Sequence, residues 1–180
     1  MINFLQKLEI KGTVIDIGGS SGAPKVGSWN PDKHIILDNN LEKEVKQKTW
    51  IEPDVVFDLN FDSWQGDMAD WVFCLDVFEY VWNPVKALET IYSMLKEGGI
   101  AVISFPFLYP HHNIAKADSL RFTRAGVENL LNNAGFKEYE IISAEAKNAD
   151  KLLEFYELEK FHKATEINHK EINFMIKAIK

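Results

Sequence analysis

Cysteine is almost absent from this chain of 180 residues, since Cys74 is its only one. A single cysteine excludes a disulfide within the chain and a metal site built from several cysteines. A reducing, cytoplasmic setting is therefore expected. The N-terminal segment also lacks the apolar core of an export signal, and no apolar run is long enough to span a bilayer. We expect neither export nor membrane insertion.

Long basic runs are missing as well. The chain carries 20 lysine and arginine residues against 27 acidic residues, which gives a formal net charge of −7. This balance shows no phosphate-binding stripe, so nucleic acid is not expected as the main partner. The sequence also lacks internal repeats and linkers, and a chain of this length can bury a full core. We therefore expect one domain over residues 1–180.

Four short apolar runs, each closing on an acidic residue, organise the first half of the chain. Asp16 lies near the end of the run 14–17 and Asp38 near the end of the segment 33–40, whereas Asp58 follows 55–57 and Asp76 follows 71–75. Short runs rich in valine and isoleucine are typical of strands that are buried on both faces. The pattern predicts four neighbouring strands whose ends carry carboxylates.

Helices alternate with strands in the second half. Asn83 and Pro84 mark the start of a helix that runs toward Gly98, and Thr123 caps a second helix that Gly135 stops. Further strands are expected at 100–105, 137–142 and 172–180, and residues 150–168 are interpreted as an inserted helix near the site. This alternation predicts an α/β fold with a doubly wound parallel sheet.

The first apolar run opens into a turn rich in glycine and serine, so that residues 12–22 read GTVIDIGGSSG. Gly18, Gly19 and Gly22 allow positive φ and have no Cβ, which lets a ligand lie against the main chain. A helix that begins near Ala23 would also direct its free amides toward that ligand. In a parallel sheet the ligand lies at the carboxyl ends of the strands. The alternative is a plain glycine-rich connection.

This turn resembles the first motif of the class I S-adenosylmethionine-dependent methyltransferases. Asp16, Gly18, Ser20 and Gly22 match an acidic residue followed by glycines at alternate positions, with serine in place of the middle glycine. The stretch CLDVFEYVWNPVKALETIYSMLKEGG resembles the family's fourth strand and the helix after it. The resemblance implies a mostly parallel seven-stranded sheet with helices on both faces and an antiparallel last strand.

The resemblance also implies S-adenosyl-L-methionine as the cofactor. Asp16 would contact the methionine amino group, usually through water, and Asp38 would accept hydrogen bonds from both ribose hydroxyls. Asp58 and Leu59 would lie beside the adenine. The whole implied cofactor set is Asp16, Gly18, Gly19, Ser20, Gly22, Asp38, Asp58, Leu59 and Asp76. For the aspartates that follow strands, a turn-forming role is the alternative.

The acceptor side is expected after the fifth strand. There PFLYPHH, followed by Asp118 and RFT, resembles a subgroup associated with sugar and polysaccharide metabolism. This implies methylation of a small molecule or glycan precursor, with oxygen favoured as the accepting atom. A neutral imidazole can take the proton of a hydroxyl near neutral pH, so His112 is the first candidate base and His111 the second. A solvated loop is the alternative for both histidines.

Three more residues complete this prediction. Asp118 could orient the histidine or take the proton itself, while Tyr109 and Arg121 are candidates for binding the acceptor. A structural ion pair between Asp118 and Arg121 is the alternative. No metal site is expected, because the adjacent histidines project differently and no further clear ligand follows.

Two other functions fit the same residues. An NAD(P)-dependent oxidoreductase also uses an acid after its second strand, but Gly18, Ser20 and Ala23 would then occupy the GxGxxG positions. A non-catalytic module that binds S-adenosylmethionine would keep the fold without turnover, and Tyr80, where many relatives carry histidine, fits that reading. The acceptor and the oligomeric state stay open.

Overall fold

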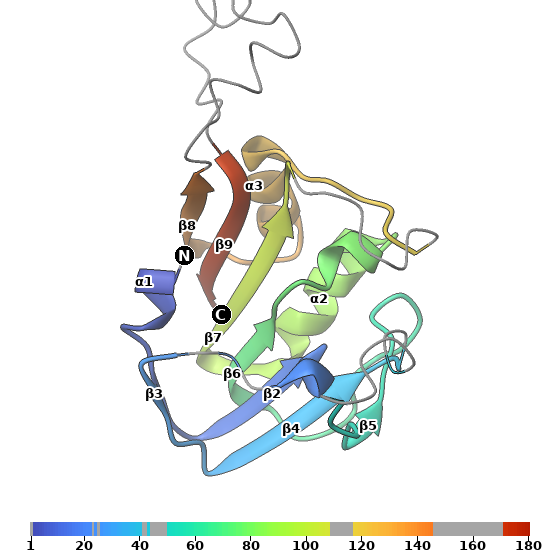
Figure 1. The fold of residues 1–180 in the computed structure, drawn as a ribbon, viewed down its shortest axis with the longest axis vertical. Coiled ribbons are helices and arrows are strands. Elements are labelled where there is room, and N and C mark those ends of the chain that lie inside the picture. The colour runs from blue at the N-terminus through green and yellow to red at the C-terminus, as the bar shows by residue number, and fades with distance from the viewer. Residues whose placement is uncertain are drawn as a thin grey trace, which may run out of the picture.

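The computed structural model describes residues 2–22, 24, 26–40, 43, 50–108, 117–145 and 171–180 (Figure 1). The first half contains α1 (Ile2–Leu5), β1 (Glu9–Ile10), β2 (Thr13–Ile17), η1 (Gly19–Ser21), β3 (Ser28–Trp29), β4 (Lys33–Asp38), β5 (Val55–Val56) and β6 (Ala69–Cys74). The second half contains η2 (Phe78–Tyr80), α2 (Pro84–Met94), β7 (Leu95–Pro106), α3 (Arg124–Asn133), β8 (Glu138–Glu145) and β9 (Glu171–Ile179).

A seven-stranded sheet in the order β5-β4-β2-β6-β7-β9-β8 forms the centre of the structure. The strands from β5 to β7 pair in parallel, and β9 is antiparallel to both β7 and β8. A separate pair, β1 and β3, is also parallel. The predicted fold class is therefore confirmed, with the last strand inserted antiparallel between its neighbours.

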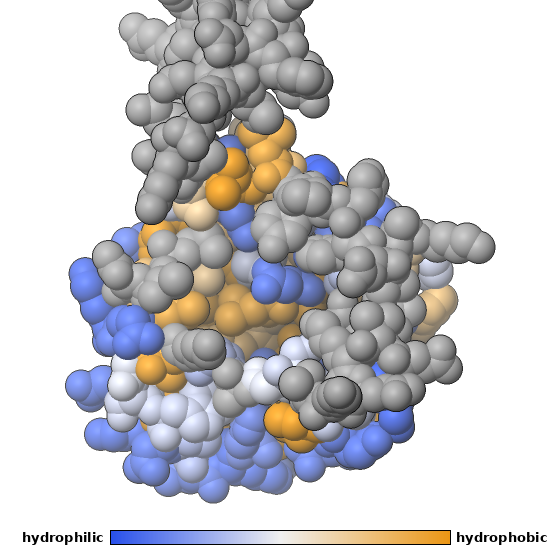
Figure 2. Space-filling model, viewed as in Figure 1, coloured by the Kyte–Doolittle hydropathy of each residue, from blue (hydrophilic) through white to orange (hydrophobic). Residues whose placement is uncertain are grey.

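The two faces of the sheet are covered differently. Side chains alternate along a strand, so Ile15 and Ile17 join the large core cluster that contains the buried residues of α2 and α3. Val14 belongs to a smaller cluster on the other face, where Leu5 of α1 and Trp29 of β3 pack. Figure 2 shows hydrophobic surface in the middle of this second face and hydrophilic surface along its lower edge.

Both long helices begin where capping residues predict. The Asn83 side chain accepts a hydrogen bond from Lys86 N at 3.3 Å, and Thr123 Oγ1 accepts one from Gly126 N at 3.2 Å. Helix α2 ends at Met94, four residues before the glycine that was expected to stop it. The reason is that the chain from Leu95 onward joins the sheet as β7.

The predicted helix near Ala23 is wrong. After β2 the chain makes only the short 3-10 turn η1, and the described residues Pro24 and Val26 are not helical. Instead, the backbone N–H groups of residues 27, 28 and 30 bond to the carbonyls of residues 5, 8 and 10. These long-range bonds create the β1–β3 pair, so the segment is used for a sheet and not for a helix.

Two other predictions were a strand at residues 55–57 and a helix at residues 150–168. The strand predicted at 55–57 is shortened to β5, a two-residue strand with exposed side chains at the edge of the sheet. The predicted helix at 150–168 lies outside the described residues. Among the helices that the structure describes, none has the length and apolarity needed to cross a membrane.

Candidate functional site

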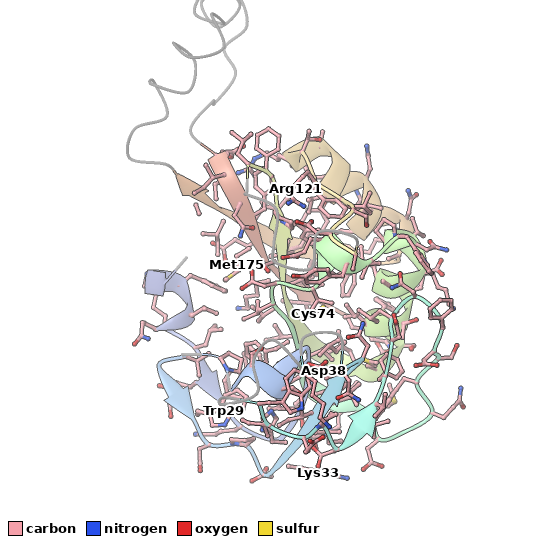
Figure 3. All side chains as sticks on the ribbon, turned by 45° about the vertical axis from the view of Figure 1, so that its right-hand side comes forward. Trp29, Lys33, Asp38, Cys74, Arg121 and Met175 are labelled. Atoms are coloured by element: carbon pink, nitrogen blue, oxygen red, sulfur yellow. The ribbon has the colours of Figure 1, made fainter. Side chains whose placement is uncertain are left out.

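The carboxyl ends of β2, β4, β5 and β6 meet at one edge of the sheet, as the sequence predicts. Because these strands are parallel neighbours, Gly18, Asp38, Asp58 and Asp76 all follow strands that end at this edge. Figure 3 shows Asp38 at the end of β4, Cys74 at the end of β6, and Arg121 on the segment that leads into α3. Residues predicted to bind the cofactor and a residue predicted to bind the acceptor therefore lie at this edge of the sheet.

The turn after β2 requires its first two glycines. Gly18 has φ +79°, and a Cβ there would lie 2.6 Å from Val77 Cγ2. At Gly19 a Cβ would lie 2.7 Å from the carboxyl carbon of Asp16. The close approach of Val77 and Asp16 explains why side chains are excluded from both positions.

The rest of the turn leaves polar groups without partners and leaves open space. Ser20 Oγ is buried and has no hydrogen-bond partner among the described residues. At Gly22, which has φ +113°, a Cβ would meet no described atom within 4 Å. A buried hydroxyl that lacks a partner is costly, so this arrangement fits a turn that closes around a polar ligand.

The acidic residue of the turn faces a histidine that the sequence analysis did not single out. Asp16 Oδ2 lies 3.4 Å from His34 Nε2 of β4, and neither atom has a hydrogen-bond partner in the described parts of the chain. Burial raises the pKa of Asp16, the nearby His34 imidazole lowers it, and the charge of Asp38 raises it again. A histidine at the start of a buried apolar run was the signal that could have identified this residue.

Asp38 is buried, and one of its oxygens forms a local turn. Asp38 Oδ1 accepts a hydrogen bond from Asn40 N at 2.9 Å, and Asn40 has φ +62°. The turn-forming role offered as the alternative is thus present in the structure. It also orients the carboxylate at the end of β4, which is compatible with the predicted contact to ribose hydroxyls.

Asp58 is held in a comparable turn. Its Oδ1 accepts bonds from both the backbone and the side-chain nitrogen of Asn60 at 2.9 Å. The Asn60 side chain also donates to Tyr80 O and accepts from Trp82 N, so it joins this loop to the one after β6. Leu59 is buried in the large core cluster. The predicted adenine contacts of Asp58 and Leu59 stay predictions.

Asp76 adopts a conformation that non-glycine residues rarely adopt. It follows β6 with φ +55°, its backbone N–H donates to Ser104 Oγ at 2.8 Å, and that hydroxyl lies 3.3 Å from Asp76 Oδ1. Backbone strain of this kind is concentrated at functional sites. The strain therefore supports the prediction that Asp76 lines the site.

On the acceptor side, Asp118 and Arg121 form a bidentate ion pair. Arg121 donates to Asp118 Oδ1 at 2.5 Å and to Oδ2 at 2.8 Å, and the Asp118 side chain is fully buried. The hydrogen bonds that Arg121 donates to Asp118 raise the pKa of Arg121. Because both carboxylate oxygens bind the guanidinium, the geometry favours the structural ion pair over a free proton acceptor.

Glu79 is the second residue that sequence reasoning missed. It belongs to η2 and is buried, and its backbone carbonyl accepts bonds from Ser119 N at 2.7 Å and from Leu120 N at 3.3 Å. Burial raises the pKa of Glu79 to about 7, and the charges of Asp76 and Asp118 add to the rise. A lone acid inside the apolar stretch VFEYVW was the available signal.

The two candidate bases and one residue predicted to bind the acceptor lie outside the described part of the chain. These residues are His111, His112 and Tyr109, and their roles stay predictions. Within the described part of the chain, no group of three or more His, Cys, Asp or Glu side chains is arranged to hold a metal ion.

S-adenosylmethionine fits the residues at this edge. Ser20 Oγ and Asp16 Oδ2, which lack hydrogen bonds in the described parts of the chain, lie at a turn that has open space beside Gly22. The oriented carboxylate of Asp38 suits a pair of ribose hydroxyls, because a carboxylate has acceptor capacity for two donors. Asp16, Ser20 and Asp38 are the residues that would hold the cofactor.

Comparison with known proteins agrees with this reading. A family model described as a methyltransferase domain matches residues 2–141. The chain is 31% identical over 91 residues to the tRNA U34 carboxymethyltransferase of Campylobacter hominis. That alignment covers 45% of this chain and 32% of the other protein. It is 25% identical over 178 residues to the enzyme of the same name from Campylobacter lari, covering 85% of this chain and 61% of that protein.

The chain thus spans less than two thirds of the curated relatives it matches. Among solved structures, the S-adenosylmethionine-dependent methyltransferase of Mesorhizobium loti has the same fold, with a TM-score of 0.64 at 15% identity. That alignment covers 99% of this chain and 95% of the other. Because the family match extends over residues 2–141, the chain belongs to the methyltransferase domain family, and its fold is that of solved S-adenosylmethionine-dependent methyltransferases.

Proposed function

We propose that this chain transfers the methyl group of S-adenosylmethionine to a small-molecule acceptor, with a hydroxyl of a sugar or polysaccharide precursor as the favoured class. The observation that carries the proposal is the charge on the acceptor side of the edge. The charges of Asp76 and Asp118 act on the buried Glu79, and Arg121 is the cation that pairs with Asp118. Together with the net charge of −7, this acidic balance does not favour a phosphate backbone as the acceptor.

In this proposal the residues of the edge have separate roles. Asp16 and the glycine turn hold the amino-acid part of the cofactor, and Asp38 holds its ribose. The bound cofactor supplies a methyl group on a positively charged sulfur that leaves as a neutral thioether. The chain contributes mainly by placing the acceptor atom in line with that methyl group.

The proton of the acceptor needs a destination. Asp118 is paired with Arg121, so in this proposal Asp118 positions Arg121, which would contact the acceptor. His112, His111 or Glu79 would take the proton, since a base is most effective when its pKa is near the working pH. Tyr109 and Arg121 would contact the acceptor.

A second candidate comes from the Campylobacter relatives, whose name is tRNA U34 carboxymethyltransferase. The similarity to the Campylobacter lari protein extends over 178 residues, which favours a tRNA acceptor. The net charge of −7 opposes it, because proteins that bind nucleic acid neutralise phosphates with lysine and arginine. We therefore place tRNA second.

A labelling experiment separates these acceptors. The protein is incubated with S-adenosylmethionine that carries a tritium-labelled methyl group, together with a cell extract divided into small-molecule, RNA and protein fractions. Label in the heat-stable small-molecule fraction supports the proposal, and label in the RNA fraction supports the tRNA alternative. Cofactor binding without label in any fraction identifies a non-catalytic binding module.

A further inference from the structure

His34 belongs to none of the motifs that identify the cofactor site, yet it faces the acidic residue of the first motif. It lies on β4 and pairs in register with Val14 of β2, two residues before Asp16. Its side chain is 22% exposed, whereas that of Asp16 is 5% exposed. The imidazole is therefore partly exposed, whereas its Nε2, the atom that faces Asp16, and the carboxylate beside it are buried.

The imidazole is fixed from two sides. The Trp29 ring meets it edge-on, with ring centroids 5.0 Å apart, and Trp29 itself packs on Phe73 at 5.9 Å. On the other side, Nε2 lies 3.4 Å from Asp16 Oδ2. This packing holds His34 against Asp16, so the distance between the two groups is set by the small β1–β3 sheet as well as by β4.

We propose that His34 is a positioning residue for the cofactor, which holds the Asp16 carboxylate under the glycine turn and offsets its negative charge when protonated. The proposal rests on the proposed role of Asp16 in the cofactor site. Two charged groups act on Asp16, namely the His34 imidazole and the carboxylate of Asp38 at the end of β4. Of the two, only His34 can carry a positive charge, and it lies 3.4 Å from Asp16 Oδ2.

The charge of His34 then controls the affinity for the donor. S-adenosylmethionine carries a sulfonium and an amino group, so it is attracted by an ionised Asp16. A protonated His34 neutralises that carboxylate and weakens the attraction, whereas a neutral His34 leaves it available. By linkage, binding of the donor must also favour loss of the proton from His34.

Calorimetric titration with S-adenosylmethionine at pH 6 and pH 8 tests this proposal. For the wild-type chain we expect the Kd to be about fivefold larger at pH 6 than at pH 8, a typical size for coupling between two binding events. The His34→Gln variant should lose most of this difference. Lys33→Gln is the matched control, since it removes a neighbouring cation of β4 that pairs with Asp67 at the far end of the strand from Asp38 (Figure 3).

A second measurement does not depend on the folding of a variant. Titrations of the wild-type chain near pH 6.5, in buffers that differ in ionisation enthalpy, should show net proton release on binding. An unchanged pH dependence in folded His34→Gln, or binding by the wild-type chain without proton release, overturns the role of His34. Failure of the wild-type chain to bind the donor at either pH contradicts the proposed cofactor site instead.

Discussion

Glu79 couples the ionisation of the site to the stability of the fold. Its pKa is about 7 in the folded protein and 4.5 in a free side chain. Between these values the folded state binds more protons than the unfolded state, so the stability contributed by Glu79 is complete below pH 4.5 and is lost as the pH rises toward 7. The buried carboxylate is thus a cost to stability at alkaline pH.

The Glu79→Gln variant tests this account, because glutamine keeps the shape and removes the charge. At pH 8 we expect the variant to exceed the wild-type free energy of unfolding by about 2 kcal/mol, after allowance for solvent relaxation around the charge. At pH 5 the difference should largely vanish. Urea denaturation at both pH values measures it, and equal destabilisation at the two values would refute the buried charge.

At Gly18, both the backbone conformation and the packing exclude a side chain. In Gly18→Ala the new Cβ would lie 2.6 Å from Val77 Cγ2, at a φ of +79° that alanine disfavours. We expect a loss of about 1–3 kcal/mol in the free energy of unfolding. Adding Val77→Ala should recover the steric part of that loss alone. Full additivity of the two substitutions in urea denaturation would show that Val77 is not the obstacle.

Asp38 is the residue that best separates turn formation from ligand binding. Asp38→Asn keeps an oxygen for the Asn40 N–H bond and removes the negative charge and one acceptor. We expect its affinity for S-adenosylmethionine to fall by about 1–3 kcal/mol, with little change in thermal stability. Asp67→Asn, at an exposed ion pair with Lys33, is the control that should bind normally. Equal affinities for Asp38→Asn and the wild-type chain would remove Asp38 from the site.

Residues were predictable from the sequence where one local pattern determines them. The glycines of the turn and the acids after the strands were found because a strand that ends in a turn has a characteristic sequence. His34 and Glu79 were missed because their importance comes from neighbours far away in the chain. His34 matters through Asp16 of another strand, and Glu79 through the loop of residues 118–121.

At the scale of elements, the start of α3 depends on a single hydroxyl. Thr123 Oγ1 accepts the bond from Gly126 N, which would otherwise lack a partner in the first turn of the helix. Thr123→Ala should lower the free energy of unfolding by about 1 kcal/mol. Thr123→Ser keeps the hydroxyl and should lose much less. Thermal unfolding compares the three proteins, and identical midpoints for Thr123→Ala and Thr123→Ser would exclude capping as the cause.

Elements followed the sequence where their signals are local and failed where long-range pairing competes. The buried strands and the two capped helices form as predicted, because apolar periodicity and capping residues act within a few positions. The segment after Gly22 did not become a helix, since its backbone donors bond to carbonyls of residues 5–10. Sequence patterns cannot reveal such a pairing when both partners are only two residues long.

For the whole molecule, the sheet order explains why one edge carries the site. The strands β4, β2 and β6 lie side by side and parallel, so the turn after β2 lies between Asp38 and Asp76. The sequence order of these strands does not give their order in the sheet. The family resemblance implied a mostly parallel seven-stranded sheet, which the structure confirms, and the structure adds the order of the strands.

Binding of S-adenosylmethionine is the central claim for the whole molecule, and calorimetric titration of the wild-type chain at pH 8 tests it most directly. We predict saturable binding at one site. The thermal midpoint of unfolding should also rise with cofactor concentration, because a ligand that binds the folded state stabilises it. A correctly folded chain that shows no binding heat and no shift of its midpoint at any cofactor concentration would contradict the account.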